Sequence, residues 1–176
     1  MRFESINCSS RCIGAFKFTL NNRCDADTSC SLVAVAFKEF GNQQAATWTE
    51  PFEKAFENQS RVHAYTVLIT EGVLFRMLLR SLVVRGTRKH TSPENHDKTL
   101  LYFGTPDLFR DTLRMHNTLA GYVFLLDGKG RVRFAGSGEA SGEEVERVIS
   151  FADTLVKADA SSKRFAKQHQ GMNARR

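Results

Sequence analysis

The chain has no cysteine beyond residue 30. Its four cysteines, Cys8, Cys12, Cys24 and Cys30, fall within the first thirty of 176 residues. A secreted, disulfide-stabilised fold would distribute its bridges through the chain, so this arrangement argues against that class. The thiols could form a zinc site or serve a redox function, but their spacing is irregular and no histidine lies between them. We therefore expect residues 1–30 to be a flexible leader with incidental thiols.

The chain also lacks a long apolar run and holds only three prolines. A membrane-spanning helix needs about 20 predominantly apolar residues, and the longest candidate, residues 73–84, is interrupted by Arg76 and Arg80. With 41% hydrophobic and 25% charged residues, the composition excludes collagen-like, coiled-coil and wholly disordered chains. The length corresponds to one domain, and any association with a membrane is expected to be peripheral.

The net charge of +6 is concentrated in two segments, 72–90 and 157–176. Basic segments of this kind bind nucleic acid, anionic lipid or acidic partners. We expect residues 158–176 to form a loose, solvated basic tail. No nucleic-acid partner is expected, because the basic residues are not interleaved with exposed aromatic ones.

Apolar residues recur at strand length in three segments and at helical spacing in two. The strands are expected at 31–37, 62–70 and 99–103, and the helices at 42–58 and 72–85. Pro51 should begin or kink the first of these helices. A further short helix should follow Pro106, because proline is tolerated in the first turn.

A β-hairpin is predicted over residues 122–135, where an Asp-Gly-Lys-Gly turn separates two apolar strands. In the second strand, the alternation directs Arg131 and Arg133 toward solvent and Val132 and Phe134 toward the core.

Ser141 and Glu144 then form a capping box that opens a last helix. The buried stripe of this helix is expected to be Val145, Val148, Ile149, Ala152, Leu155 and Val156. Strands alternating with helices imply a mostly parallel central sheet covered by helices on both faces, and the hairpin adds an antiparallel part. This order predicts a thioredoxin-like α/β domain over residues 31–157.

Such a fold often carries a Cys-x-x-Cys pair at the start of the helix after the first central strand, where amides and the helix dipole stabilise a thiolate. Counting back from Pro51 puts these positions near Gln43 and Ala46, and the segment contains no cysteine. Residues 115–122 also lack the proline that would flank a reactive thiol. We therefore expect no enzymatic activity, unless leader cysteines substitute.

Other sites are weakly indicated. Gly136-Ser137-Gly138 lies between a strand and a helix and could cradle an anion, although a flexible exit from the hairpin explains the glycines equally well. His63 lies in a predicted strand and is expected to be structural rather than a ligand. No cofactor and no metal are predicted, because no nucleotide fingerprint or metal spacing is present.

Residues 31–156 resemble the assembly factor of the mitochondrial F-type ATP synthase known as the tenth ATPase-complex subunit. The matching pieces are SLVAVAFKEFGNQQAATWTEPF at 31–52, VLITEGVLFRMLLR at 67–80 and HNTLAGYVFLLDGKGRVRFAGSGEASGEE at 116–144. The last piece is the most specific. The leader and the basic tail are not part of the match.

The resemblance implies a non-enzymatic chaperone at the matrix side of the mitochondrial inner membrane. Its client would be the membrane subunit a (subunit 6), which it would help to join the ring of c subunits. A client surface would combine the degenerate redox face with the apolar, basic helix at 72–85, which is either buried or a partner surface. The candidate contact residues are Asn42, Gln43, Trp48, Arg76, Arg80, His116, Asn117 and Tyr122. The alternative from another class is a thioredoxin- or peroxiredoxin-like thiol oxidoreductase that uses leader cysteines.

Overall fold

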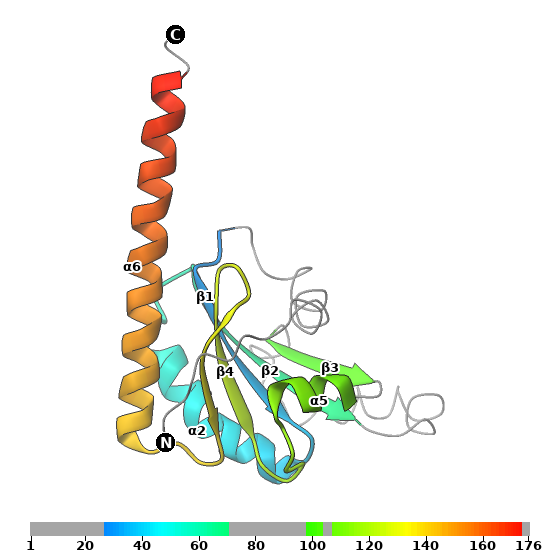
Figure 1. Ribbon diagram of the computed structural model, residues 1–176. Helices are drawn as coiled ribbons and strands as arrows, with labels where there is room; N and C mark the ends of the chain where they lie inside the picture. Colours follow the sequence, from blue (N-terminus) through cyan, green and yellow to red (C-terminus); the bar gives the residue numbers. More distant parts are fainter. Residues whose placement is uncertain (1–26, 71–97, 104–106, 174–176) are drawn as a thin grey trace.

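The computed structural model describes residues 27–70, 98–103 and 107–173, and these form one mixed sheet with three helices packed around it (Figure 1). The sheet has five strands in the order β3-β2-β1-β4-β5. The strands are β1 (Cys30–Ala36), β2 (Val62–Thr70), β3 (Thr99–Phe103), β4 (Tyr122–Asp127) and β5 (Val132–Ser137). The helices are α2 (Glu39–Ala55), α5 (Asp107–Leu113) and α6 (Gly142–Asn173). The predicted α/β architecture is confirmed.

The central strand β1 is buried along its whole length, as its continuous apolar sequence predicts. It pairs in parallel with β2 and antiparallel with β4, while β3 and β5 extend the sheet on the two sides. The strand begins at Cys30, which is only 1% exposed. The assignment of Cys30 to a flexible leader is therefore wrong. This residue belongs to the first strand, and its side chain packs inside the domain.

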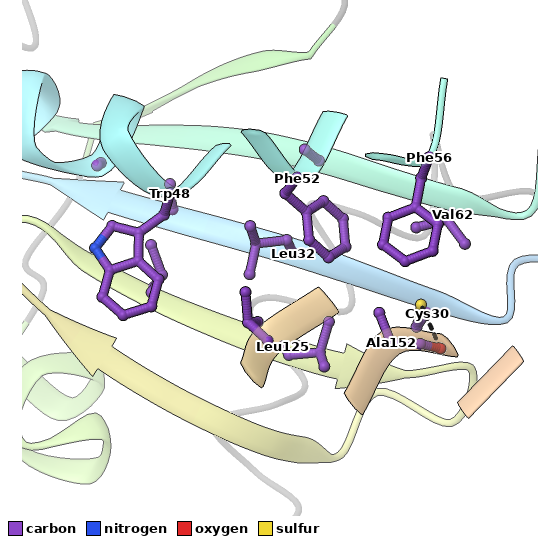
Figure 2. Close-up of a cluster of buried hydrophobic side chains, with 13 residues drawn as sticks. Cys30, Leu32, Trp48, Phe52, Phe56, Val62, Leu125 and Ala152 are labelled. Carbon is purple, nitrogen blue, oxygen red and sulfur yellow. Dashed lines mark hydrogen bonds between the residues drawn. The ribbon is translucent and has the colours of Figure 1, made fainter. Parts of the chain in front are cut away.

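Helices cover both faces of the sheet, as predicted. On one face α2 and α6 pack over Leu32 and Leu125, and Figure 2 shows Trp48, Phe52 and Phe56 in a row beneath α2. On the other face, a second cluster includes the last residue of α5 and the segment that follows it. Its members include Val33, Val35, Phe37, Tyr65, Val67, Leu113, Met115 and Phe124. The helix α2 begins twelve residues before Pro51, so this proline lies inside the helix and does not begin it.

The hairpin forms as predicted, but its second strand is not amphipathic in the predicted way. A β-bulge shifts the register, so that Phe134 pairs with Leu125 while Val132 pairs with Leu126. Phe134 consequently packs on the α2–α6 face, and Val132 packs on the opposite face. The prediction that Val132 and Phe134 share one inward face is wrong, because the bulge breaks the two-residue alternation.

The capping box is present at the start of α6. Ser141 N and Oγ donate to the Glu144 carboxylate at 3.0 and 2.9 Å, and Glu144 N donates to Ser141 Oγ at 3.4 Å. The backbone and side-chain hydrogen bonds from Ser141 lower the pKa of Glu144. Val148 and Ala152 of the predicted stripe are fully buried. The helix continues to Asn173 and extends well past the sheet (Figure 1). The predicted loose tail is thus helical over 158–173, because a helix can continue after its apolar stripe ends.

Ion pairs hold the middle of α6 to the start of the sheet. Asp159 accepts a hydrogen bond from Ser29 Oγ at 3.0 Å, forms an ion pair with Arg61 and lies 3.2 Å from Lys163 Nζ. Lys163 also forms an ion pair with Asp27, and the hydrogen bond to this carboxylate raises the pKa of Lys163. This cluster anchors α6 just beyond its last apolar contacts.

The expected helix at 72–85, with Arg76 and Arg80, lies outside the described residues, as do Cys8, Cys12 and Cys24. Within the part of the chain that the structure describes, none of the helices combines the length and apolarity needed to cross a bilayer.

Candidate functional site

The first turn of α2 packs tightly against the segment that leads into β4. A Cβ atom added to Gly121 would overlap with the carbonyl oxygen of Gly41, and one added to Gly41 would lie 3.0 Å from Ala120 backbone atoms. Gln44 Oε1 accepts a hydrogen bond from Gly121 N at 3.1 Å. Two glycines and one amide side chain therefore join the helix start to this segment.

The segment 116–121 is also held by its own hydrogen bonds. The Tyr122 hydroxyl accepts from Asn117 N at 2.9 Å and donates to Asn117 O at 3.1 Å. Asn117 Oδ1 accepts from Leu119 N at 3.0 Å. These bonds fix the backbone of the segment while the His116 and Asn117 residues stay exposed.

Five of the eight candidate residues lie on the two segments that pack against each other at Gly41 and Gly121. Gln43 is exposed and Asn42 half-buried on the first turns of α2, beside a segment that carries the exposed His116 and Asn117 and is tied down by the half-buried Tyr122. Arg76 and Arg80 fall outside the described residues, so their role stays a prediction.

Trp48 is a core residue and not a contact residue, which corrects the prediction. It is 1% exposed, and its Nε1–H donates to Gly138 O at 2.9 Å. The indole packs against the Phe134 ring, with 5.8 Å between centroids, and a Cβ at Gly136 would come within 2.7 Å of it. The indole therefore fills the space under β5 (Figure 2), where a client could not reach it.

Two exposed apolar side chains at this site were missed by the sequence reasoning. Phe40 on the first turn of α2 is 60% exposed, and Leu119 in the segment that packs on that turn is 58% exposed. The available signal was the position of Phe40, which lies one residue off the buried stripe formed by Gly41, Ala45 and Trp48. The site thus presents two apolar side chains among amides and an imidazole.

The one cysteine that the structure describes lies far from this site. Cys30 begins β1, whereas α2 follows the other end of the strand, and six residues of strand span about 20 Å. Its Sγ donates weakly to Ala152 O at 4.0 Å (Figure 2). Burial, followed by the charges of Asp153 and Asp159, raises its pKa to about 12. Because only a thiolate is nucleophilic, this thiol is inert at neutral pH.

Gly136 and Ser137 belong to β5, and the contacts of Gly138, just after the strand, favour a structural role for these glycines over an anion cradle. Gly138 N donates to Gly121 O at 2.8 Å, and Gly138 O accepts from the Trp48 indole. These polar groups are used to join the loop to the core. Gly138 adopts a φ of +80°, which explains why glycine is required there. The described residues also contain no group of three His, Cys, Asp or Glu side chains placed to bind a metal ion.

A separate groove of about 1030 Å³ lies between the second half of α2 and the start of β2. Its walls include the apolar side chains of Phe52, Phe56 and Val62, together with polar groups. Lys98 Nζ and Glu53 Oε1 form an ion pair of 2.8 Å at this groove. His63 lines it as well and lies on β2 with its ring 6.0 Å from that of Tyr65, in the strand position that was predicted.

A family model described as ATP10 protein matches residues 25–155 of the chain. No curated protein sequence matches. Solved structures with a similar thioredoxin-like fold include a thiol:disulfide interchange protein of the thioredoxin family from Chlorobium tepidum, at 13% identity and a TM-score of 0.42, covering 72% of this chain and 81% of that one. Yeast Sco1 with copper bound has 11% identity and a TM-score of 0.47, with 73% and 80% covered. An exposed lipoprotein thioredoxin from Streptococcus pneumoniae has 10% identity and a TM-score of 0.47, with 72% and 87% covered.

Proposed function

The chain belongs to the ATP10 protein family of ATP synthase assembly factors, and from this premise we propose that it is a non-enzymatic assembly chaperone for the membrane sector of the mitochondrial enzyme. It would act at the matrix side of the inner membrane and help subunit a (subunit 6) to join the ring of c subunits.

The observation that carries this proposal is the chemistry of the surface at the start of α2. Where a thiol would have to stand for disulfide exchange, the chain has Gln43 and Ala46. Close by, Phe40 and Leu119 expose apolar surface to solvent although both lie on a well-anchored backbone. Exposed apolar side chains on a rigid support favour binding of an apolar client, because their burial is favourable and little order is lost.

The test replaces both apolar side chains by charged ones. We expect Phe40→Glu with Leu119→Glu to weaken association with subunit a about tenfold or more, since central apolar contacts dominate binding energy. The measurements are crosslinking of the chain to subunit a in mitochondria and the amount of assembled ATP synthase on native gels.

Phe151→Glu is the matched control. Phe151 is 44% exposed but lies on α6, where its ring is 6.1 Å from that of Phe134. This variant should keep full assembly activity. If the double variant assembles the enzyme as well as the control does, with equal thermal stability, this surface is not the client site.

The basic helix expected at 72–85 is a second part of the proposed surface. Arg76→Glu with Arg80→Glu should weaken client or membrane association without unfolding the domain. Full assembly activity in this variant would remove the helix from the client site.

The alternative, a thiol oxidoreductase that uses leader cysteines, predicts a different result. Replacing Cys8, Cys12, Cys24 and Cys30 by serine should leave a binding chaperone active, whereas an oxidoreductase would lose its function. The buried Cys30 counts against the alternative, because its pKa of about 12 keeps it protonated.

A further inference from the structure

The segment 117–121, which carries the exposed Leu119, uses its backbone groups within the domain. The amides of Asn117, Leu119, Ala120 and Gly121 all donate hydrogen bonds inside it, at 2.9 to 3.2 Å. The carbonyl oxygens of Asn117 and Gly121 accept such bonds as well. Residues 118 and 119 form a turn and not an extended strand. Because a peptide that added here as a strand would need the same groups on an extended backbone, the segment does not offer a strand edge.

Phe40, the other exposed apolar side chain, stands on a backbone that cannot pair sideways either. It belongs to the first turn of α2, and the backbone groups of an α-helix point along the helix axis. Both side chains therefore reach a partner from backbones that give it no edge to extend. What this surface presents to a client is its side chains.

The surface is also without net charge. Within residues 38–44 and 111–121, the Lys, Arg, Asp and Glu side chains number two of each sign and are all exposed: Lys38, Arg114, Glu39 and Asp111. An excess of one sign would be needed to favour an acidic or a basic client. An uncharged apolar partner is the complementary one, because Phe40 and Leu119, both more than half exposed, gain free energy when they are covered.

An α-helix has both properties that this surface requires. Its backbone hydrogen bonds are made inside the helix, so it needs no pairing partner, and residues three and four apart place apolar side chains on one face. The client proposed above comes from the membrane sector, where a segment in lipid must satisfy its own backbone groups, as a helix does. An extended segment would find no backbone partner here, and each group left unpaired on burial costs free energy.

We propose that the part of the client bound at Phe40 and Leu119 is an apolar α-helix, held by side chains and not by backbone pairing. This rests on the proposed function, because it specifies what the same surface binds. The two apolar side chains come from different elements, α2 and the segment 117–121, and contact one face of the client helix.

Disulfide trapping in mitochondria, with the full chain, tests the proposal. The three cysteines outside the described residues are replaced by serine, and single cysteines are placed in turn along a subunit a that has no others. Phe40→Cys should trap positions of one segment that recur every third or fourth residue, which is the spacing of one helix face. Leu119→Cys should trap the same segment with the same spacing. Phe151→Cys on α6 is the matched control and should trap no position above background.

The spacing of the trapped positions separates the possible results. Trapping at every second position would mean an extended client strand, and trapping without a period would mean a mobile contact. Either result overturns the client helix but leaves the client site in place. No trapping from Phe40→Cys or from Leu119→Cys would overturn the proposed client site, and the client helix with it.

Binding of a synthetic peptide gives an independent measurement. The peptide has the sequence of the trapped segment, carries a fluorophore and is kept in detergent micelles, and its binding to the full chain is followed by fluorescence anisotropy. Proline at a central position that faces away from the trapped cysteines should weaken binding about tenfold or more, because it breaks a helix. α-Aminoisobutyric acid at the same position, which favours a helical backbone, is the matched control and should leave the affinity within about threefold. Equal affinities of the two peptides would contradict a helical client.

Discussion

The contact between Gly41 and Gly121 is the most exacting feature of the proposed client site. In Gly121→Ala the new methyl group would overlap with Gly41 O and lie 3.0 Å from Ala45 N, and both are backbone atoms of a packed helix. Forcing a methyl group into such a space costs about 1–3 kcal/mol. The hydrogen bond from Gly121 N to Gln44 Oε1 would also be strained, at a further cost of about 1 kcal/mol. We expect a total loss of about 2–4 kcal/mol in the free energy of unfolding.

The assay is urea and thermal unfolding followed by circular dichroism. A loss of this size lowers Tm by about 5–15 °C in a protein of this length. Gly142→Ala is the matched control, because a Cβ there meets nothing within 4 Å and should leave stability unchanged or slightly raised. Gln44→Ala should cost about 1 kcal/mol by itself. If Gly121→Ala is within about 0.5 kcal/mol of the wild type, the helix start does not pack on this segment and the site geometry is wrong.

Three further predictions concern stability and thiol reactivity. Trp48→Phe should destabilise the domain by about 2–3 kcal/mol in urea unfolding, because it shrinks a buried side chain and removes the donor to the carbonyl oxygen of the half-buried Gly138, yet client binding at low temperature should persist. Asp127→Asn should cost about 1–3 kcal/mol at pH 7, because Asp127 accepts hydrogen bonds from Arg131 and Arg133. Burial raises the pKa of Asp127, but these hydrogen bonds and those from the turn backbone lower it by more. The net result is a pKa below the usual 3.8. The advantage of the wild type over Asp127→Asn is therefore complete above pH 3.8 and should shrink as the pH falls from 3.8 through the lowered pKa of the folded state. A constant difference down to about pH 2 would contradict the assignment. In a variant whose other cysteines are serine, Cys30 should resist alkylation by iodoacetamide at pH 7.5 until the protein is unfolded. The reason is that its pKa of about 12 leaves about one thiol in 10⁴–10⁵ ionised. Mass spectrometry measures the alkylated fraction.

Local patterns were sufficient for most of the secondary structure. The strands β2 and β3 begin and end where the apolar, β-branched runs do, and the capping box marks the start of α6. These features depend on neighbours within a few residues, so they can be read from spacing alone. Predictions from spacing were wrong where longer-range interactions matter. The bulge in β5 rotates Val132 to the other face of the sheet. The helix α6 continues beyond its apolar stripe, where Asp159 forms ion pairs.

For the candidate site, too, the sequence predicted some features and tertiary packing decided others. The order of the described strands and helices, and the lack of a thiol near Gln43 and Ala46, could be read from the amino-acid sequence, because the residue type alone states what chemistry a position can carry. Which side chains reach solvent was decided by packing. Trp48 is buried against Phe134 and donates a hydrogen bond to a residue ninety positions away, whereas Phe40 is exposed because it lies off the buried stripe of α2. Helical spacing places Phe40 off the buried stripe and Trp48 on it, but the exposed fraction of each side chain depends on atoms that approach only after the sheet has formed.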